Sequence, residues 1–576
     1  MSPSYRAVEL GPDSDIVEFQ FEGRAIRGRR GESLAAALTA VGERELRITR
    51  EDAYRGIFCG MGVCQECLVE IDGRAGERAC MTKLEKPIDV RRQKFLPAAR
   101  EIFGADQPAD VLEPDILVLG GGAGGLNAAA AAAQAGAKVL VVDERPVAGG
   151  QFYKQRLDAA GFAQALPDDP QFAGGRALIA RVKAAGVALL QGAQVWGAFE
   201  PLDLMLFDGK VSRLCRPKRL IVATGAYERG LPVPGWTLPG VMTTGAAQTL
   251  LRSYGVLAGR RLLVAGNGPL NLQVALELAR AGAEIPAVAE LAPKPGVRSL
   301  GALLCMAGST PDLLLQGWRY RGELARRKIP LRYGHVLAGV AATQGRLRAR
   351  LAPWPGAEDA TSLTFDVDAV LMGYGFMPSN EILRALGCRH GFDPERGHLV
   401  CERHVDCATS VANVYAVGDC AGLGGARAAE AEGKLAGMAA ALSLNLSLTV
   451  GQDRERRAAT VALRRHRRFQ AGLWQLFAAP RPTIELAEPH TFICRCEELS
   501  KAGIDESFAE GPRGIGTIKR ATRAGMGRCQ GRYCGPLLAA IAAERQGQAS
   551  DEAGFWAPRP PIKPIAIADI VAAGDS

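Results

Sequence analysis

Long apolar runs are missing from this 576-residue sequence, which argues against a helix that crosses a membrane. No stretch approaches the about 20 apolar residues that such a helix needs. The Ala-rich stretch 128–133 is too short and is assigned to an amphipathic helix. The first 15 residues are mixed and polar and lack the apolar core of a signal peptide. We therefore expect no transmembrane segment and, by default, a cytoplasmic location.

The sequence also has little that favours nucleic-acid binding, although its net charge is +9. Much of the local positive charge falls between Arg454 and Arg468, where no stacking aromatics or nucleic-acid-binding motif accompany it. We therefore expect no nucleic-acid partner. The basic stretch is interpreted as the solvated face of a helix. A docking surface for an acidic protein partner is the alternative.

Disulfide bonds are not expected, because eight of the 14 cysteines fall into two sets with metal-ligand spacing. The first set reads C-x4-C-x2-C-x12-C, and its first three positions match the plant-type ferredoxin loop. The second set reads C-x-C-x32-C-x4-C. We predict a [2Fe-2S] cluster at each set, with zinc as the competing metal. The predicted ligands are Cys59, Cys64, Cys67 and Cys80 in the first set and Cys494, Cys496, Cys529 and Cys534 in the second.

The remaining cysteines are scattered and are interpreted as ordinary thiols. They are Cys215, Cys305, Cys388, Cys401, Cys407 and Cys420.

A dinucleotide-binding fingerprint lies between the two cysteine sets. A short apolar strand, 115–119, runs into G-x-G-x-x-G with its glycines at Gly120, Gly122 and Gly125, and a helix is predicted over 126–135. A second strand, 138–142, leads to Asp143 and Glu144. Their distance from the last glycine of the motif is close to the about 20 residues after which an acid that binds a ribose is expected. The glycines let a pyrophosphate approach the N-terminus of the helix, where free amides favour negative charge.

Three further stretches indicate that the dinucleotide is FAD. They are typical of flavoproteins with two dinucleotide-binding domains, and in the last of them the acid binds the ribityl chain. The residues concerned are Gly150 and Gln151, then Thr224 and Gly225, and finally Gly418 and Asp419.

A second nucleotide-type unit begins at Arg261. Its glycines stand at Gly266 and Gly268, but Asn271 replaces the third, and Glu290 ends the next predicted strand. In the superfamily this inserted domain binds NAD(P). The missing glycine and the lack of a cationic reader for a 2′-phosphate leave NAD(P), ATP and a vestigial fold without ligand as alternatives.

Redox-active dithiols at the flavin are also lacking. Disulfide reductases of this fold carry C-x4-C after the Gly-Gly pair or C-x-x-C in the second nucleotide domain. Here Gln151 follows Gly150 and Cys305 is unpaired, so dithiol chemistry is not expected. No convincing general base for amine oxidation is found, and no catalytic residue is assigned. Leu473 to Phe477 are interpreted as core rather than as a cofactor site.

The predicted fold is a multidomain α/β and α+β protein. An N-terminal β-grasp ferredoxin-like domain and a C-terminal small helical [2Fe-2S] domain flank a two-dinucleotide-domain FAD/NAD(P) fold. The C-terminal domain resembles the bacterioferritin-associated-ferredoxin type. The predicted ranges are 1–108 for the ferredoxin-like domain, 109–255 and 371–450 for the FAD domain, 256–370 for the nucleotide-binding insert and 451–576 for the C-terminal domain. The Pro-rich tail from Pro558 is expected to pack along a domain or partner surface.

The order of these parts resembles the α subunit of heteromeric amine and imino-acid dehydrogenases. Relatives in that family include the opine oxidases, the hydroxyproline dehydrogenases and the fused first two subunits of hydrogen cyanide synthase. The resemblance implies an enzyme that acts on CH–NH or CH–NH2 groups of an opine, a D-amino acid or an imino acid.

The same resemblance implies partners. A β subunit similar to glycine or D-amino-acid oxidases would oxidise the substrate, and this chain would pass the electrons through FAD and the clusters to a downstream acceptor. An FMN at a subunit interface and a small third subunit are left open.

Two other functions remain as alternatives. One is a stand-alone NAD(P)H-dependent flavin and iron–sulfur reductase of an external electron carrier, which needs a working second nucleotide site. The other is not enzymatic: the C-terminal cluster domain would serve as a redox-sensitive docking module.

Overall fold

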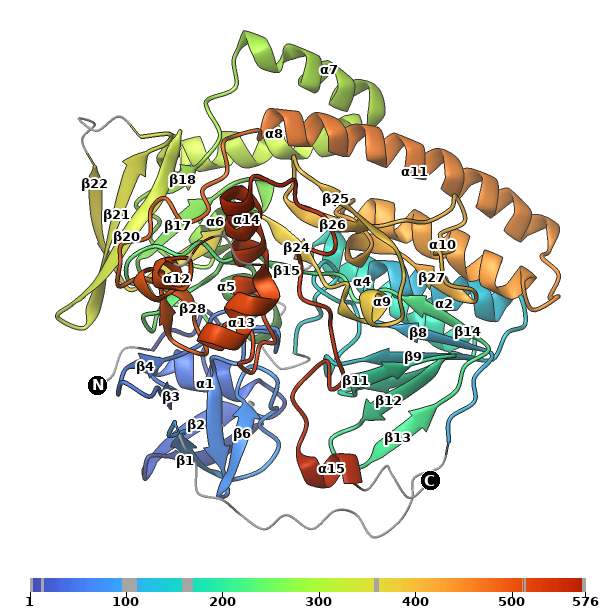
Figure 1. The fold of residues 1–576 in the computed structure, drawn as a ribbon, viewed down its shortest axis with the longest axis horizontal. Helices are drawn as coiled ribbons and strands as arrows, with labels where there is room; N and C mark the ends of the chain where they lie inside the picture. The colour runs from blue at the N-terminus through green and yellow to red at the C-terminus, as the bar shows by residue number, and fades with distance from the viewer. Residues whose placement is uncertain are drawn as a thin grey trace.

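The computed structural model describes residues 4–11, 15–95, 111–157, 169–356, 362–509, 511 and 514–571. Figure 1 shows an N-terminal module at the lower left, a parallel-sheet module at the right, a second one at the upper left, and the C-terminal helices between them. Among the described residues, no helix is long and apolar enough to cross a membrane.

The N-terminal module is a five-stranded mixed sheet in the order β2-β1-β7-β5-β6, with one helix packed on it. Alternating burial along β1 places Val17, Phe19 and Phe21 in the core. Ser33 caps the helix, as predicted, by accepting a hydrogen bond from the Ala36 amide. The bounds are β1 Ile16–Phe21, β2 Arg24–Arg29, α1 Leu34–Ala40, β3 Arg47–Ile48, β4 Tyr54–Arg55, β5 Leu68–Ile71, β6 Arg74–Arg78 and β7 Asp89–Arg92.

The first parallel-sheet module has the strand order β10-β9-β8-β14-β27, all parallel. Its central strand β8 is buried at every position, which explains the unbroken apolar run 116–119. A three-stranded antiparallel sheet, β11-β12-β13, lies beside it. The bounds are β8 Ile116–Leu119, β9 Val139–Asp143, α4 Pro170–Ala184, β10 Ala188–Gln191, β11 Gln194–Phe199, β12 Asp203–Phe207, β13 Ser212–Cys215, β14 Arg219–Val222 and β27 Val414–Ala416.

Helices α2 (Ala123–Gln134) and α10 (Ala426–Leu442) cross in close contact on this sheet. A Cβ on Gly433 would lie 2.1 Å from the Gly124 carbonyl oxygen, and one on Gly437 would lie 2.2 Å from that of Ala128. Helix α2 is buried from Ala123 to Ala132, so the prediction of an amphipathic helix is wrong here. The close crossing of α10 removes the solvent-facing side that an amphipathic helix would have.

The second parallel-sheet module has the strand order β16-β23-β17-β18-β19. Its outer strand β16 precedes the predicted range 256–370 and its second strand β23 extends past the end of that range, and the β15–β24 ribbon joins the sheet to the first module. The bounds are β15 Ala226–Glu228, β16 Val241–Thr243, α5 Thr244–Tyr254, β17 Leu262–Gly266, α6 Pro269–Arg280, β18 Val288–Glu290, β19 Leu331–Tyr333, β20 His335–Thr343, β21 Arg346–Pro353, β22 Leu363–Val367, β23 Ala369–Gly373 and β24 Phe376–Pro378.

The connection from β18 to β19 is unusually long and leaves the module. It carries the turn η1 (Val297–Ser299) and helices α7 (Leu300–Ser309) and α8 (Pro311–Arg326). Helix α7 packs on the long helix α11 (Val450–Leu476) of the C-terminal region, and both cross the top of the molecule in Figure 1.

The C-terminal module is small and helical, and its tail runs down to the antiparallel sheet of the first module (Figure 1). Its apolar core includes Cys494 and Cys534 of the second cysteine set. Smaller elements complete the chain. Their bounds are α9 Glu381–Ala385, β25 His390–Asp393, β26 His398–Cys401, η2 Gly418–Cys420, β28 Phe492–Cys494, β29 Leu499–Ser500, α12 Lys501–Ser507, α13 Ile515–Thr522, α14 Cys534–Gln546 and α15 Ile567–Val571.

The α2–α10 crossing yields a stability prediction. Replacing Gly437 with Ala places a methyl group against a fixed helix backbone, so we expect a loss of about 2 kcal/mol in the free energy of unfolding. Gly322→Ala in α8 is the matched control, because a Cβ there meets no atom within 4 Å and should add about 0.5–1 kcal/mol. Urea denaturation followed by circular dichroism measures both. Equal stability of the two variants would contradict the close packing of the crossing.

Candidate functional site

A cavity of about 910 Å³ opens above the carboxyl ends of the first parallel sheet. The turn after β8 forms its floor. Gly120 has φ +107°, and a Cβ there would lie 2.3 Å from the Ala223 carbonyl oxygen, so only glycine fits. The Gly121 amide donates to the Asp143 carboxylate at 2.6 Å, which fixes the turn against the end of β9. Burial raises the pKa of Asp143.

Most of the predicted dinucleotide residues meet in this cavity. Gly125 is the exception in the first unit, because a Cβ there would lie 1.9 Å from the Gly120 carbonyl oxygen and its role is to let α2 pack. The predicted residues that line the cavity are Gly120, Gly122, Asp143, Glu144, Gly150, Gln151, Thr224, Gly225, Gly418 and Asp419.

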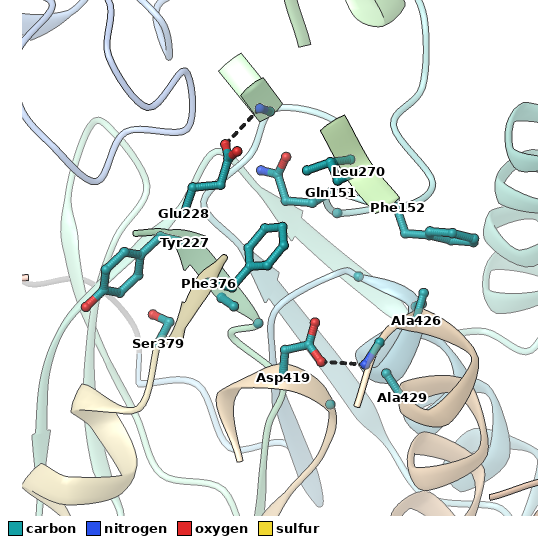
Figure 2. Close-up of a pocket in the computed structure, with 18 of the residues that line it drawn as sticks. Gln151, Phe152, Tyr227, Glu228, Leu270, Phe376, Ser379, Asp419, Ala426 and Ala429 are labelled. Atoms are coloured by element: carbon teal, nitrogen blue, oxygen red, sulfur yellow. Dashed lines mark hydrogen bonds between the residues drawn. The ribbon is translucent and has the colours of Figure 1, made fainter. Parts of the chain in front are cut away.

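Asp419 lies on the opposite wall of the cavity and holds the start of α10 in place. Its Oδ1 accepts hydrogen bonds from the Gly424 and Gly425 amides, both at 2.9 Å, at the start of α10. Burial raises the pKa of Asp419. Figure 2 shows Asp419 on one side of the cavity and Gln151 and Glu228 on the other, with the ring of Phe376 between them. The turn, the helix start and the aromatic wall suit a dinucleotide with a flat ring system.

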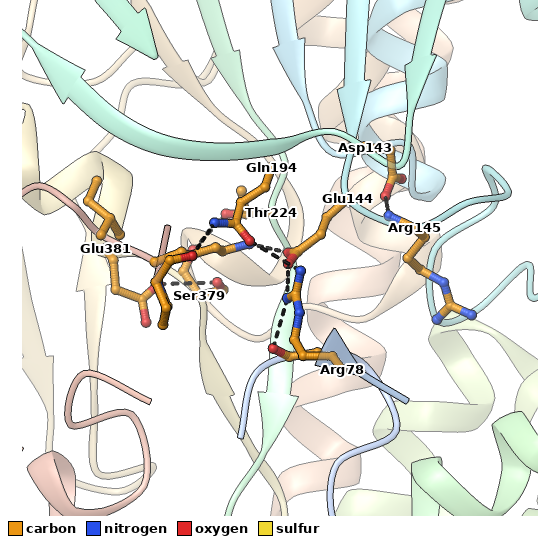
Figure 3. A network of polar contacts seen from close by, with 12 residues as sticks. Arg78, Asp143, Glu144, Arg145, Gln194, Thr224, Ser379 and Glu381 are labelled. Carbon is orange, nitrogen blue, oxygen red and sulfur yellow. Dashed lines mark hydrogen bonds and ion pairs between the residues drawn. The ribbon is translucent and has the colours of Figure 1, made fainter. Parts of the chain in front are cut away.

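Glu144 lines the cavity, but its carboxylate is held by two cations. Arg78 of the N-terminal module pairs with one oxygen and Lys563 of the tail with the other. Burial raises the pKa of Glu144, but Lys563 and Arg78 outweigh it and hold the pKa at about 2. Figure 3 shows Arg78 reaching Glu144 beside Gln194. Three modules are thus tied at one carboxylate.

The C-terminal tail forms a strap over this end of the cavity, which we define as residues 562–564. The Ile562 amide donates to the Trp196 carbonyl at 2.7 Å, and Arg532 donates to the Ile562 carbonyl at 3.2 Å. Gln194 donates to the Pro564 carbonyl at 2.9 Å. All three strap residues line the cavity. No local sequence signal marks Lys563 as a site residue, because its partner Glu144 lies far away in the chain.

A second cluster missed by sequence reasoning lies at the other end. Lys154 is buried, and its ammonium donates to the Gln151 carbonyl at 2.7 Å and to Gln248 at 2.9 Å. Glu228 accepts from the Gly245 amide at 2.8 Å, and its Oε1 has no partner within the described residues. Burial, followed by the charges of Arg145 and Arg252, lowers the pKa of Lys154 to about 7. The only sequence hint was the position of Lys154 just after Gln151.

The first cysteine set sits in a loop pressed against α5. A Cβ on Gly60, which has φ +61°, would lie 2.9 Å from the Ala246 Cα. The Met61 and Cys64 amides donate to the Cys59 sulfur at 3.5 and 3.4 Å. The four thiols pair as Cys59 with Cys64 and Cys67 with Cys80.

The thiols of the second set also lie together. Cys496 and Cys529 lie 3.5 Å apart, sulfur to sulfur, and Cys494 contacts both Cys496 and Cys534. In the described part of the chain, no three candidate ligands converge on one point as they would around a single metal ion. Each set gathers four cysteine sulfurs, which are the ligands that a [2Fe-2S] cluster takes.

The loops of the two sets are joined by a buried ion pair. Glu66 lies between Cys64 and Cys67, Arg495 lies between Cys494 and Cys496, and their side chains are 3.5 Å apart. Burial raises the pKa of Glu66, but the arginines around it outweigh burial and the pKa is lowered. Arg47 and Arg55 complete the cluster, at 2.9 and 3.9 Å from Glu66.

An aromatic wall continues this junction toward the cavity. The Arg495 guanidinium lies over Phe58 at 3.9 Å and over Trp236 at 4.6 Å. Phe58 contacts Tyr533 edge to face at 5.4 Å between ring centroids. Phe58 precedes Cys59 and Tyr533 precedes Cys534, so the two cysteine loops touch through their neighbouring rings.

The glycine turn of the second nucleotide unit lies outside the large cavity. Gly266, Gly268 and Glu290 come together but do not line the large cavity. The Glu290 carboxylate accepts from Asn267 and from the amides of Gly268 and Ala292, and burial raises its pKa to about 7. Asn267 also donates to the carbonyl of Phe477, at the end of α11. Asn271, at the place of the missing glycine, donates to the Gly373 carbonyl at 2.9 Å.

The interpretation of Leu473 to Phe477 as core is only partly right. Leu473, Leu476 and Phe477 line the large cavity, whereas Trp474 stacks under Arg396. The cavity therefore extends from the dinucleotide floor to α11.

Comparisons with known proteins agree with this geometry. The family model for pyridine nucleotide-disulphide oxidoreductase matches residues 114–434, the 2Fe-2S iron-sulfur cluster binding domain matches 14–94, and the sarcosine oxidase A3 domain matches 488–575. The A subunit of opine oxidase from Rhizobium meliloti (strain 1021) is 33% identical, covering 79% of this chain and 98% of that protein.

Two further similarities extend over most of the chain. Hydrogen cyanide synthase subunit HcnB of Pseudomonas aeruginosa is 31% identical over 78% of this chain and 96% of that protein. L-proline dehydrogenase from P. horikoshii has a similar fold, with a TM-score of 0.72 at 20% identity, covering 99% of this chain and 100% of that chain.

The buried Lys154 predicts a pH dependence of stability. Its folded pKa of about 7 lies below the unfolded value, so the unfolded chain binds more protons between pH 7 and about 10 and stability rises with pH in that window. Lys154→Met removes this gain, so between pH 6 and pH 9 the wild type should gain about 2–3 kcal/mol over the variant. Urea denaturation at both pH values measures the difference.

Lys183→Met serves as the control, because Lys183 is exposed on α4. The difference between this control and the wild type should not change with pH. A pH-independent difference between Lys154→Met and the wild type would show that Lys154 is not buried as described.

Proposed function

The chain belongs to the pyridine nucleotide-disulphide oxidoreductase family, in the group that contains the opine oxidase A subunits and HcnB, and on that premise we propose that it is the α subunit of a heteromeric dehydrogenase. It contains an FAD-binding oxidoreductase domain and a [2Fe-2S] domain. The proposed substrate of the complex is an opine, a D-amino acid or an imino acid similar to hydroxyproline. Its CH–NH or CH–NH2 group is oxidised on a partner subunit.

One observation carries the proposal: the cavity that suits FAD is bordered by both cysteine loops. Cys59, Gly62 and Val63 line it from the first loop, and Arg528 and Arg532 line it from the second. When bound, FAD accepts electrons in pairs and can release them one at a time, and each [2Fe-2S] cluster carries single electrons. A site between two such clusters suits the splitting of electron pairs.

The residues of this chain would bind and orient the cofactors. The turn at Gly120 and the start of α10, held by Asp419, would receive the pyrophosphate and the ribityl chain. Asp143 lies at the end of β9, where the ribose would bind. The strap, anchored by Lys563 on Glu144, would exclude water from this end. The four thiols of each cysteine set would ligate the irons.

Substrate oxidation is proposed to take place on a separate β subunit, because no general base is assigned in this chain. The names of the relatives support several subunits, since both the opine oxidase and the hydrogen cyanide synthase relatives are named as single subunits of their enzymes. The proposed β subunit resembles glycine or D-amino-acid oxidases. An FMN between subunits, a small third subunit, and a downstream electron acceptor complete the proposal.

The contacts at the second nucleotide unit bear on the alternative, a stand-alone NAD(P)H-dependent reductase. Glu290 accepts hydrogen bonds from Asn267, Gly268 and Ala292, the glycines of this turn do not line the large cavity, and the end of α11 contacts the turn through Asn267. These contacts favour a unit without NAD(P) or ATP. They support the role of a subunit over that of the reductase.

Anaerobic reduction of the purified chain tests the proposal directly. With its flavin and cluster absorbance confirmed, the chain should not bleach when NADH or NADPH is added, because the second nucleotide turn lies outside the cavity and is bonded to the end of α11. Bleaching should follow when an amino or imino acid is supplied together with a β subunit similar to amino-acid oxidases. Fast bleaching by NADH or NADPH alone would replace this proposal with the reductase.

The two cysteine sets predict two independent clusters. Replacing Cys67 with Ser should remove one of two [2Fe-2S] signals in the electron paramagnetic resonance spectrum of the reduced protein, and Cys529→Ser should remove the other. Cys215→Ser, at a buried cysteine outside both sets, is the control and should keep both signals. Bound zinc in place of iron at either set, measured by elemental analysis, would contradict the cluster assigned to it.

A further inference from the structure

The helices α7 and α8 form an arm that exposes large apolar side chains to solvent. Leu304 is 72% exposed and Trp318 is 60% exposed. We define the arm as residues 293–326, within the connection between β18 and β19. The large hydrophobic residues exposed on it are Val297, Leu300, Leu304, Leu315 and Trp318. Apolar side chains gathered in this way on a surface mark an interaction site.

The exposed face of the arm is not left over from poor packing. On the other face of α7, Ala302 and Met306 are buried against α11, where a Cβ on Gly472 would lie 2.8 Å from the Met306 side chain. Arg465 of α11 donates to the Ser309 carbonyl at 3.1 Å. One face of α7 therefore holds the arm on the body of the protein, and the opposite face carries Leu300 and Leu304.

The arm also borders the proposed cofactor cavity. Leu303, Leu314 and Trp318 line the same cavity as Gly120 and Asp419. Phe469 and Leu473 of α11 line it next to them. A protein bound to the arm would thus cover an apolar approach to the dinucleotide site, where electrons from a separate oxidising subunit have to enter.

The positive charge around the arm indicates which kind of partner binds it. Several exposed cations on and around it form no ion pair within the described residues; they include Lys294, Arg298, Arg319, Arg326, Arg464 and Arg468. The exposed acid of the arm, Asp312, is paired with Arg427 at 3.4 Å. A second copy of this chain would bring the same cations against these, which is unfavourable across a symmetric interface. A partner with an apolar patch and an acidic rim is complementary.

We propose that the α7–α8 arm is the docking surface for the electron-delivering β subunit, which meets it with an apolar patch rimmed by acidic side chains. This inference rests on the proposed function. It adds where the β subunit binds and which chemistry recognises it.

Site-specific photo-crosslinking tests the docking surface. A photoreactive phenylalanine analogue is placed at Leu304, at Trp318 or, as control, at Val405, which is 91% exposed on the body of the protein. Each full-length variant is co-expressed with the amino-acid-oxidase-like β subunit. We expect crosslinks to that protein from positions 304 and 318 and none from position 405.

A second measurement uses charge. Leu300→Asp with Leu304→Asp, at two exposed positions that do not line the cavity, should weaken binding of the β subunit, with the dissociation constant raised at least tenfold, and Val405→Asp should leave it unchanged. Flavin content and dithionite reduction of the isolated variants should match the wild type. Matching values show that the chain remains folded.

The outcomes separate the two proposals. A stable complex whose crosslinks arise only from position 405, or whose affinity survives the double substitution, overturns the docking surface and leaves the proposed function intact. Crosslinks between two copies of this chain would also overturn it. Failure of the wild-type chain to form any complex with the β subunit overturns the proposed function and the docking surface together.

Discussion

The buried carboxylate of Glu66 is the interaction on which the rest of the arrangement depends. Glu66 is 1% exposed and lies among Arg47, Arg55 and Arg495. The positive charges of these three arginines, which come from two modules, compensate the loss of water around its carboxylate. Removing one partner of such a buried group typically costs about 3–5 kcal/mol. Because Glu66 and Arg495 each lie between two predicted cluster ligands, this contact sets the distance between the cysteine loops. The ferredoxin-like module and the C-terminal module therefore act as one body at the site.

The large cavity is a product of assembly rather than of one domain. The first parallel sheet supplies its floor, the cysteine loops border one side, and α11, the arm and the strap supply the rest. Two modules built on the same nucleotide-binding topology are placed differently in this assembly. In the first, the glycine turn faces the cavity, whereas in the second Gly266 and Gly268 do not line it and Asn267 donates to the Phe477 carbonyl at the end of α11. Topology alone does not decide which glycine turn faces the cavity.

Sequence was sufficient where the chemistry is local. The turns, strand ends and helix starts in the cysteine loops and in the run from Gly120 to Asp143 depend on residues that are neighbours in the sequence. Their local geometry could therefore be predicted from the sequence. The pairing of Lys563 with Glu144 and that of Lys154 with Gln248 could not be predicted, because each joins segments far apart in the chain. Asp419 was predicted, yet its bonds to the start of α10 are visible only in the folded structure. The ligand assignments of the predicted site residues remain predictions.

The strap has a consequence for how the protein is made. Its anchor Lys563 is synthesised long after the turn that it closes over, which begins at Gly120. Domains generally fold during synthesis from the N-terminus onward. The floor of the cavity can therefore form before the strap has been synthesised, and the wall that the strap supplies is added later. Flavin captured in that interval would sit in a site that is open at this end, so closure of the holoprotein waits for the strap.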